Sequence, residues 1–258
     1  VITVVYNDVK HIRKTMESFF SQTWEDKEYI VIDGGSTDGT VDVIREYSGR
    51  LAFWCSEKDD GIYDAMNKGI SHVTGDWINI LNSGDEYVSG LSLEKAMTSV
   101  DLAGVDVIYG NSIEKNEGFK RRIVAGDDYK KLEYGPTYRH GSSLIRADLQ
   151  RRYLYDLSQA DRLGYALDWY MIFSVYKGGA RFRKVDVDIE IYDKKGVSNH
   201  PYKNLFYNYK ITSQGIFSLK KFLFFIKLLL ITYLKNTKMY LWLKAFAMEY
   251  MVNDILPH

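Results

Sequence analysis

Short apolar runs alternate with amphipathic stretches through the first hundred residues. The runs at 1–5, 28–32, 51–55 and 76–81 predict strands, and those at 28–32 and 76–81 are expected to be buried. The clearest helix is expected from 61 to about 73, where one face collects the apolar residues Ile62, Ala65, Met66, Gly69, Ile70 and Val73. Asp8 and Asp60 are expected to cap helices, and Thr40 to start another. Repeated strand–helix units predict an α/β fold with a parallel or mixed sheet.

The pattern becomes less regular beyond residue 104. We expect strands at 105–109, 121–124 and 185–192, and a helix over roughly 159–177. The chain therefore divides into three predicted parts, which are an α/β half over 1–104, a second half of the same domain over 105–205, and a helical tail over 206–258.

The tail differs from the body in both hydropathy and charge. Residues 222–234 are strongly apolar but include Lys227, and the run falls short of the about 20 residues that cross a bilayer. Residues 201–258 hold eight lysines against two carboxylates, a net charge of +6 that leaves −6 on residues 1–200. We expect residues 216–235 to form an interfacial helix on a membrane surface, and nucleic acid is a poorer candidate. A helix packed on a partner, a second copy or the core remains an alternative.

Composition sets further limits. A hydrophobic content of 46% with 15% aromatic residues argues against disorder and supplies a sizeable core for one large domain with an appendage. The lone Cys55 excludes an internal disulfide framework and fits a reducing cytoplasm. No secretory signal opens the chain, and Val1 lies inside an expected strand, so we expect a few native residues to precede it.

Two acidic loops carry the candidate chemistry. Asp33-Gly-Gly-Ser-Thr-Asp-Gly39 and Leu81-Asn-Ser-Gly-Asp85 each follow an expected buried strand. Ligands of open parallel sheets bind beyond the carboxyl ends of the strands, so the loops could form one site. Carboxylates there could bind a nucleotide's hydroxyls or a hard divalent metal. The structural alternative is that Asp33 only shapes a turn before Thr40 and that Asp85 is a solvated turn residue.

Five motifs, taken together, resemble those of a known protein family. The chain carries Thr3-Val-Val-Tyr-Asn7, Ser21-Gln-Thr23, the strand and loop 29–40, Gly61-Ile-Tyr-Asp-Ala-Met-Asn-Lys-Gly69 and Thr74-Gly-Asp-Trp77, in that order. This combination resembles family 2 glycosyltransferases, and more narrowly the bacterial enzymes that build capsular, O-antigen or colanic-acid type polysaccharides. The likeness is dense over residues 1–90, thinner from 105 to 200 and absent after 205.

The resemblance implies an A-type glycosyltransferase fold and a donor site. Residues 1–104 would bind a nucleotide-sugar, usually a UDP-sugar, and residues 105–205 would bind the acceptor. The implied donor-binding residues are Thr3, Val5, Asn7, Asp33, Ser36, Asp38, Asp64, Asn67, Lys68, Ser83 and Gly84. Asp33 would contact the base. For Lys68 the structural alternative is an i,i+4 pair with Asp64 on the helix surface.

The chain departs from the family at the metal motif. The family has two carboxylates there, whereas this chain has Gly84 at the first position and Asp85 at the second. Asp85 is the expected ligand of Mn²⁺ or Mg²⁺, with possible help from Glu86. The diphosphate supplies further oxygen ligands, so Gly84 does not by itself imply an inactive protein.

The second half must supply a base for inverting transfer. Asp168, in Tyr165-Ala-Leu-Asp-Trp-Tyr-Met171, matches the family's aspartate that opens an acceptor-side helix, and Asp161 is the reserve candidate. His140 is an acceptor-side candidate, and we expect it to form a hydrogen bond there rather than to transfer a proton. The segment 194–200 resembles a late loop that closes on the diphosphate, with Ser198 and His200 as weaker candidates.

The leading hypothesis is a metal-dependent inverting glycosyltransferase that acts on a glycan or lipid-linked acceptor, in the cytoplasm at the inner face of the membrane. A non-catalytic glycosyltransferase-like binding subunit is the alternative, supported by Gly84 alone. A sugar nucleotidyltransferase is less favoured, because those enzymes carry a glycine-rich loop where this chain has Tyr6-Asn7-Asp8.

Overall fold

The structure is a computed structural model that describes residues 1–116, 118–194 and 200–235. Ser198 and the end of the predicted tail, 236–258, lie outside the described residues. The chain forms two compact units, Val1–Val197 and Ser198–His258, and each is described by itself. The predicted division at residue 104 stays a prediction.

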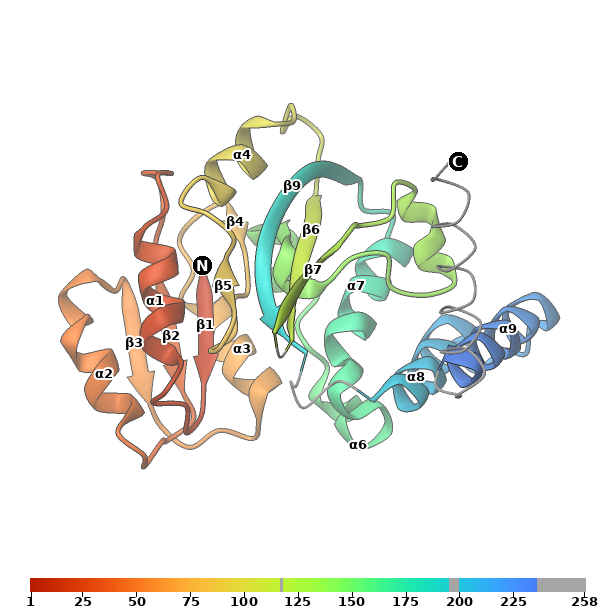
Figure 1. Ribbon diagram of the computed structural model, residues 1–258, viewed down its shortest axis with the longest axis horizontal. Coiled ribbons are helices and arrows are strands. Elements are labelled where there is room, and N and C mark those ends of the chain that lie inside the picture. Colours follow the sequence, from red (N-terminus) through yellow and green to blue (C-terminus); the bar gives the residue numbers. More distant parts are fainter. Residues whose placement is uncertain (117, 195–199, 236–258) are drawn as a thin grey trace, which may run out of the picture. The chain divides into compact units, whose positions relative to one another are not determined.

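The first half builds a three-stranded parallel sheet in the order β1-β2-β3 (Figure 1). Its elements alternate as predicted, with β1 (Ile2–Val5), α1 (Ile12–Phe20), β2 (Ile30–Asp33), α2 (Thr40–Glu46), a 3-10 turn η1 (Ser48–Arg50), β3 (Phe53–Ser56) and α3 (Ile62–Ser71). Val5 and Val31 belong to the core beneath α1 and α2, whereas Ile2 and Ile32 face Gly69 of α3. Both faces of this sheet are therefore covered by helices, as is usual for parallel strands.

A second, mixed sheet has the order β4-β8-β6-β9-β5, with β7 paired to β6. Its strands are β4 (Trp77–Ile78), β5 (Glu86–Tyr87), β6 (Val107–Asn116), β7 (Phe119–Ile123), β8 (Ser143–Arg146) and β9 (Phe182–Asp193). The predicted strand 76–81 is divided between the sheets. Trp77 and Ile78 pair with β8, while Ile80 lies parallel to Ile2 of β1. The mixed α/β architecture predicted from the sequence is confirmed.

The helices that follow α3 in the first unit are short, except for α7. They are α4 (Ser92–Thr98), α5 (Ala147–Arg152), α6 (Ala160–Leu163) and α7 (Leu167–Lys177), with 3-10 turns η2 (Tyr129–Glu133), η3 (His140–Ser142), η4 (Leu157–Gln159) and η5 (Gly164–Ala166). The single helix predicted over 159–177 is wrong, because the chain breaks at Gly164, whose φ is 51°. This break lets α7 begin at Leu167, so that Asp168 lies in its first turn.

Both predicted aspartate caps are wrong. Helix α1 begins at Ile12 after His11, and it is the backbone carbonyl of Asp8 that accepts the amides of His11 and Ile12, at 3.1 Å each. Helix α3 begins after Gly61, and the amide of Asp60 donates to the Asp64 carboxylate at 3.1 Å. The Asp8 side chain is thereby released for contacts with another loop.

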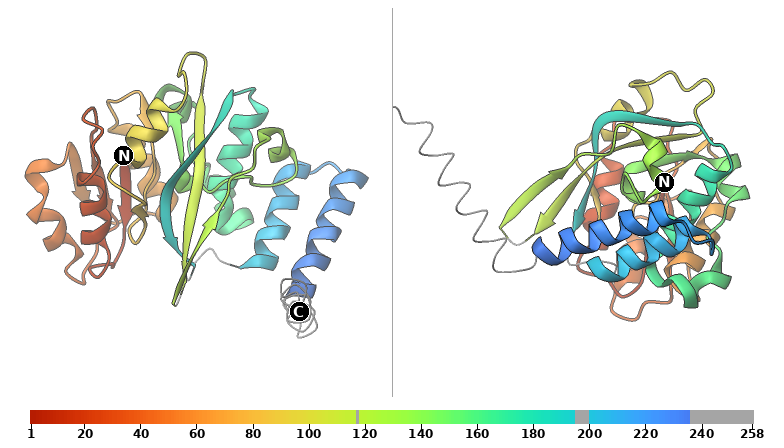
Figure 2. Two further views of the ribbon diagram at one scale, coloured as in Figure 1. Left: turned by 45° about the horizontal axis from the view of Figure 1, so that its top comes forward. Right: turned by 90° about the vertical axis from the view of Figure 1, so that its right-hand side faces the viewer.

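The second unit contains α8 (Pro201–Ser213) and α9 (Leu219–Lys235), which lie side by side in Figure 2. Tyr209 of α8 stacks on Phe225 of α9 with ring centres 5.1 Å apart. The opposite face of α9 leaves apolar side chains exposed, among them Leu219, Leu223, Leu230 and Leu234. Within the described residues, no helix combines the length and the apolar character that crossing a membrane requires.

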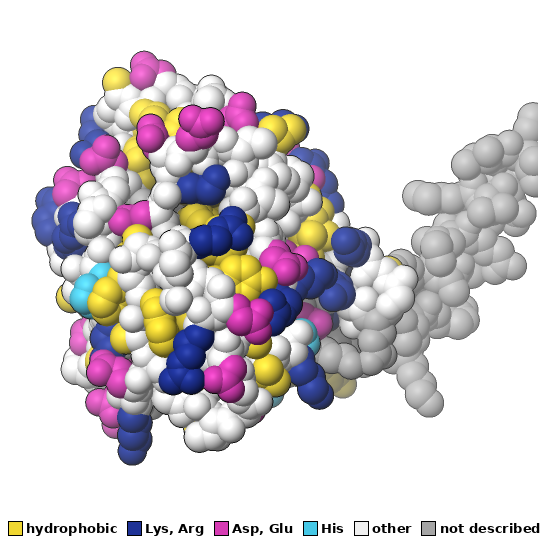
Figure 3. Space-filling model, turned by 90° about the vertical axis from the view of Figure 1, so that its left-hand side faces the viewer, with side chains coloured by type: hydrophobic (Ala, Val, Ile, Leu, Met, Phe, Trp, Pro, Cys, Tyr) yellow, Lys and Arg dark blue, Asp and Glu magenta, His cyan; other side chains and the backbone are white. Residues whose placement is uncertain are grey.

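Charge is distributed differently over the two units. On the face of the first unit that carries α2 and β3, acidic and basic side chains are interspersed (Figure 3). The stretch 200–235 instead holds six lysines and no carboxylate. The excess of positive charge in the tail is therefore a local property of this unit.

Candidate active site

The first acidic loop is organised around Asp33, the last residue of β2. Its carboxylate accepts the amides of Gly35 and Ser36 at 3.0 and 2.9 Å and the hydroxyl of Ser56 at 2.6 Å. The side chain is fully buried. Asp33 therefore holds the loop in shape in this structure, and its contact with the base stays a prediction.

Loop 33–40 is joined to the loop that follows β1. The amide of Asn7 donates to Ser36 Oγ at 2.7 Å, and Asn7 Oδ1 accepts the amide of Thr37 at 2.8 Å. Asn7 adopts a φ of 49°, which is uncommon for a residue with a side chain. Ser36 and Asn7, two of the predicted donor-binding residues, thus form one continuous rim at the carboxyl edge of the sheet.

Asp38 fastens the same two loops one turn further on. Its carboxylate accepts the amides of Val9 and Thr40, at 3.0 Å each. Hydrogen bonds from the Thr40 hydroxyl and then from the Val9 amide hold the pKa of Asp38 below its usual range. Asp38 is therefore ionised at neutral pH and supports the rim.

The structure places the side chain of Thr3 inside the sheet. Its side chain is completely buried, and its hydroxyl bonds to the carbonyl of Leu81 at 2.7 Å and to the Tyr29 hydroxyl at 2.8 Å. A group enclosed between strands cannot contact a ligand at the loop edge. Val5 is also buried, and its carbonyl accepts the amide of Gly34 at 2.9 Å. Both side chains therefore belong to the interior of the sheet, and a contact of their backbone groups with the nucleotide stays a prediction.

The second acidic loop lies against α1 and the β1 loop. Ser83 Oγ donates to Asp8 Oδ2 at 2.7 Å. Thr15 Oγ accepts the amide of Gly84 at 3.0 Å and donates to the carbonyl of Asp85 at 2.8 Å. Gly84 has a φ of 93°, a conformation that costs little only for glycine. The backbone conformation at residue 84 therefore favours glycine over the carboxylate residue that the family has there.

Asp85 is the one carboxylate of this loop, and it fits a hard divalent cation. Among the described residues its side chain makes no hydrogen bond or ion pair. Burial raises the pKa of Asp85 well above its usual range, the charge of Glu190 raises it further, and Arg139 opposes the shift. A bound cation would stabilise the ionised form. No group of three or more metal-ligating side chains occurs within the described ranges, so any metal would depend on ligand oxygens as well.

The three predicted residues of α3 have partners already. Lys68 Nζ lies 3.0 Å from Glu57 and 3.4 Å from Asp64, so the i,i+4 pair of the structural alternative is present. The side-chain amide of Asn67 forms two hydrogen bonds with the backbone of Tyr155. It donates to the carbonyl at 2.8 Å and accepts from the amide at 2.9 Å. In this structure Asn67 positions a segment of the second half.

His140 and Asp168 approach the same part of α3. His140 Nε2 lies 2.8 Å from the Tyr155 hydroxyl, and burial lowers the pKa of His140, so its ring is neutral near pH 7. Asp168 Oδ1 accepts the amide of Trp169 at 2.7 Å and lies 3.4 Å from the hydroxyl of Tyr63. The candidate base and the acceptor-side histidine are therefore linked to the donor-side motif, whereas Asp161, on α6, makes no hydrogen bond or ion pair with that motif among the described residues.

Two charged residues of this site were missed by the sequence analysis. Glu190 of β9 is 1% exposed, and Arg139 Nε lies 3.4 Å from Glu190 Oε2. The available signals were a lone glutamate in a strand of β-branched residues and an arginine directly before His140. Neither signal shows which carboxylate the arginine would meet.

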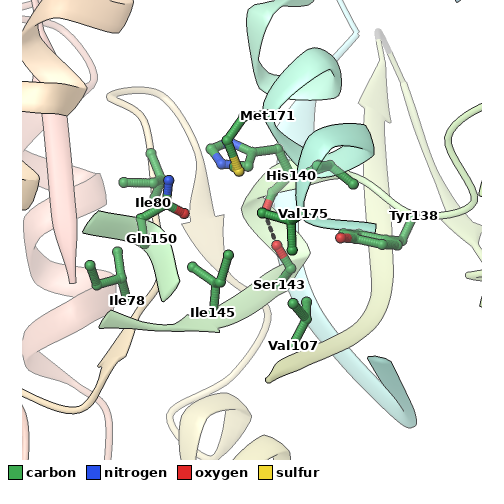
Figure 4. A pocket seen from close by; sticks show the side chains of 11 residues that line it. Ile78, Ile80, Val107, Tyr138, His140, Ser143, Ile145, Gln150, Met171 and Val175 are labelled. Carbon is green, nitrogen blue, oxygen red and sulfur yellow. Dashed lines mark hydrogen bonds between the residues drawn. The ribbon is translucent and has the colours of Figure 1, made fainter. Parts of the chain in front are cut away.

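A small cavity lies beside His140 and Tyr138 (Figure 4). Figure 4 shows apolar side chains from β4, β8 and α7 closing around it, and the hydrogen bond from Ser143 Oγ to the carbonyl of His140. Its volume of about 10 Å³ holds one water molecule at most. It is therefore a packing feature and not a substrate pocket.

Comparison with known proteins agrees with this geometry. The family model described as Glycosyl transferase family 2 matches residues 1–153. An uncharacterized glycosyltransferase of Mycobacterium tuberculosis is 35% identical over 123 residues, covering 47% of each chain. A PGL/p-HBAD biosynthesis glycosyltransferase of Mycobacterium bovis is 30% identical over 109 residues, covering 41% of this chain and 43% of the relative. The match thus spans less than half the length of these curated relatives.

Solved structures show the same fold at low sequence identity. S. aureus TarS 1–349 in complex with UDP-GlcNAc has a TM-score of 0.61 and 16% identity, over 88% of this chain and 70% of that one. The mannosyltransferase PcManGT from Pyrobaculum calidifontis, in complex with GDP-Man and Mn²⁺, has a TM-score of 0.64 and 16% identity. The match covers 100% of this chain and 75% of that one.

Proposed function

The chain belongs to glycosyl transferase family 2, and from this premise we propose that it transfers a sugar from a nucleoside diphosphate to a glycan or lipid-linked saccharide, with inversion at the anomeric carbon. The observation that carries the proposal is the joining of three loops at one edge of the parallel strands. Asn7, Ser36 and Asp8 hold these loops together through side-chain hydrogen bonds, and Asp85 lies in the third with its carboxylate unbonded among the described residues.

Asp85 would hold a Mn²⁺ or Mg²⁺ ion together with the diphosphate. When bound, the ion neutralises charge on the leaving diphosphate. The ion in the PcManGT complex is Mn²⁺, which supports this assignment. A UDP-sugar is the proposed donor, since TarS binds UDP-GlcNAc, and GDP-sugars are the natural comparison.

Asp168 is the proposed base. It would take the proton of the acceptor hydroxyl as that oxygen attacks the anomeric carbon. The Tyr63 hydroxyl, 3.4 Å from Asp168 Oδ1, would keep the carboxylate near the donor-side motif. His140 is neutral and bonded to Tyr155, which suits hydrogen bonding on the acceptor side better than proton transfer.

A direct test is product analysis with UDP-sugar and GDP-sugar panels in Mn²⁺ and a set of lipid-linked and free saccharides. The proposal predicts release of the nucleoside diphosphate coupled to a product of inverted anomeric configuration, assigned by NMR. Nucleotide-sugar binding without transfer to any acceptor would favour the non-catalytic subunit. That alternative rested on Gly84, for which the positive φ now supplies a structural reason.

The proposed acceptor side includes an anionic membrane surface, with the protein on the inner, cytoplasmic face. The exposed leucines of α9, together with Lys220 and Lys227 nearby in the helix, combine apolar and basic character. Flotation with anionic vesicles tests it, using the full chain, a deletion of 216–258, and Leu223→Glu/Leu230→Glu. Equal flotation of all three proteins would contradict binding of the tail to a membrane surface.

A further inference from the structure

Arg139 is held in a fixed position by two residues of β9. Its guanidinium carbon lies 3.3 Å from the ring centre of Tyr192, a stacked arrangement that favours a cation. Its Nε lies 3.4 Å from Glu190 Oε2. Glu190 is itself buried and accepts a bond from Ser112 Oγ at 3.2 Å. Because Glu190 and Tyr192 belong to a strand of the sheet, their contacts fix the direction of the Arg139 side chain.

Gly141 explains how a glutamate fits at this place. A Cβ added to Gly141 would lie 2.1 Å from Glu190 Oε1, far inside van der Waals contact. Any side chain at 141 would displace the carboxylate that bonds Arg139. The glycine two residues after the arginine and the glutamate on β9 thus form one structural unit.

The strand register shows where Arg139 is directed. Strand β5 pairs antiparallel with β9, with Glu86 opposite Ile191 and Tyr87 opposite Glu190. Asp85 comes directly before Glu86, and β9 continues past Ile191 to Tyr192 and Asp193. Alternate residues of a strand share a face, so Glu190 and Tyr192 lie on one face of β9, and the Arg139 held there is close enough to Asp85 for its charge to lower the pKa of that carboxyl.

The charges around Arg139 agree with this placement. Burial alone would lower the pKa of Arg139, but the negative charges of Glu190, Asp85 and Asp168 outweigh it and raise the pKa. Arg139 is therefore a permanent cation that feels both the candidate metal ligand and the candidate base. Its side chain is 36% exposed. Its one hydrogen bond to a described residue uses Nε, which leaves the terminal nitrogens for a ligand.

We propose that Arg139 binds the β-phosphate of the donor and stabilises the departing diphosphate, with Glu190 and Tyr192 as its positioning residues. This inference rests on the proposed function. As the acceptor oxygen forms its bond to the anomeric carbon, the bond from that carbon to the β-phosphate oxygen breaks and the electron pair stays on the diphosphate. The acceptor proton goes to Asp168. A guanidinium offers paired donors to phosphate oxygens, beside the carboxylate that would hold the cation.

The test is calorimetric titration of UDP and UMP in Mn²⁺ against wild type, Arg139→Gln and the control Arg181→Gln, whose arginine bonds Asp106 instead. We expect Arg139→Gln to weaken UDP by about tenfold or more and to leave UMP nearly unchanged. The control should match wild type. An unchanged ratio of UDP to UMP affinity in Arg139→Gln would overturn the inference.

Two further variants keep the test decisive if Arg139→Gln does not fold. Arg139→Lys keeps the charge but cannot form two parallel bonds, so UDP should weaken about threefold to tenfold with UMP unchanged. Glu190→Gln should lower the selectivity for UDP in the same direction. Wild-type affinity for UDP in both would contradict the inference. A wild-type protein that binds no nucleotide would contradict the proposed function itself, which separates the two failures.

Discussion

Asn67 of α3 binds both backbone groups of Tyr155, with its carboxamide nitrogen 2.8 Å from the carbonyl and its oxygen 2.9 Å from the amide. The hydroxyl of the same tyrosine lies 2.8 Å from His140 Nε2. A residue of the donor-side motif therefore sets the position of the acceptor-side histidine. The two halves of the first unit share one framework here.

Asn67→Ala should destabilise this framework. It leaves the amide and carbonyl of Tyr155 without their partner, and we expect the free energy of unfolding to fall by about 2 kcal/mol. Denaturant unfolding measures the change, with Ser71→Ala on the exposed end of the same helix as the control. Equal stability of the two variants would show that Asn67 is free to serve the donor instead.

Asp168→Asn should remove the base while keeping the site intact. We expect kcat to fall by about 100-fold to 10,000-fold, with UDP affinity within twofold of wild type. Asp161→Asn is the matched control, since Asp161 lies on α6 before the break at Gly164, and it should keep near-normal turnover. The reverse pattern, with Asp161→Asn inactive and Asp168→Asn active, would exclude the assignment.

Gly84→Asp should not repair the metal motif. The backbone at residue 84 has a φ of 93°, and a side chain there costs about 1–3 kcal/mol. We expect both Gly84→Asp and Gly84→Ala to lower the melting temperature, and we expect no gain in Mn²⁺-dependent UDP affinity for the aspartate. Tighter binding at unchanged stability would mean that the loop accepts the usual pair of acids.

His140 should make stability depend on pH. Burial lowers the pKa of His140 in the folded protein, so below the unfolded pKa of about 6.5 the unfolded state binds more protons. The stabilisation is therefore complete above that pH and is lost as pH falls further. The free energy of unfolding of wild type should fall as the pH drops below about 6.5, and that of His140→Gln should change less over the same range.

His72→Gln is the control for this titration, because His72 is exposed at the end of α3. It should follow the wild-type profile. Parallel curves for wild type and His140→Gln would show that the buried ring carries no part of the pH dependence.

The sequence was sufficient for the first half because hydrophobic periodicity is a local signal. The buried strands β1 and β2, the half-buried strand β3 and the amphipathic face of α3 appear where strands and a helix were predicted. It was insufficient for bonds within the loops. Asp33 was located correctly at the end of its strand, but periodicity cannot show that four donors from its own loop and from Ser56 would occupy its carboxylate.

The second half depends on contacts between distant segments. Glu190 meets Arg139 because β6 pairs with both β8 and β9, which brings the segment before β8 to β9, and because Gly141 leaves space for the carboxylate. No window of sequence contains these three facts together. The break at Gly164 was missed for a related reason, since apolar spacing continues across it and only the backbone conformation ends the helix.

The most direct test of the account is calorimetric titration of the full chain with UDP and with GDP, each in Mn²⁺ and in EDTA, beside Asp85→Asn. The account predicts that UDP binds in Mn²⁺, that EDTA weakens it strongly, and that Asp85→Asn abolishes the dependence on metal. Failure of both nucleotides to bind under any metal condition, or UDP binding that is the same in EDTA and in Asp85→Asn, would contradict it.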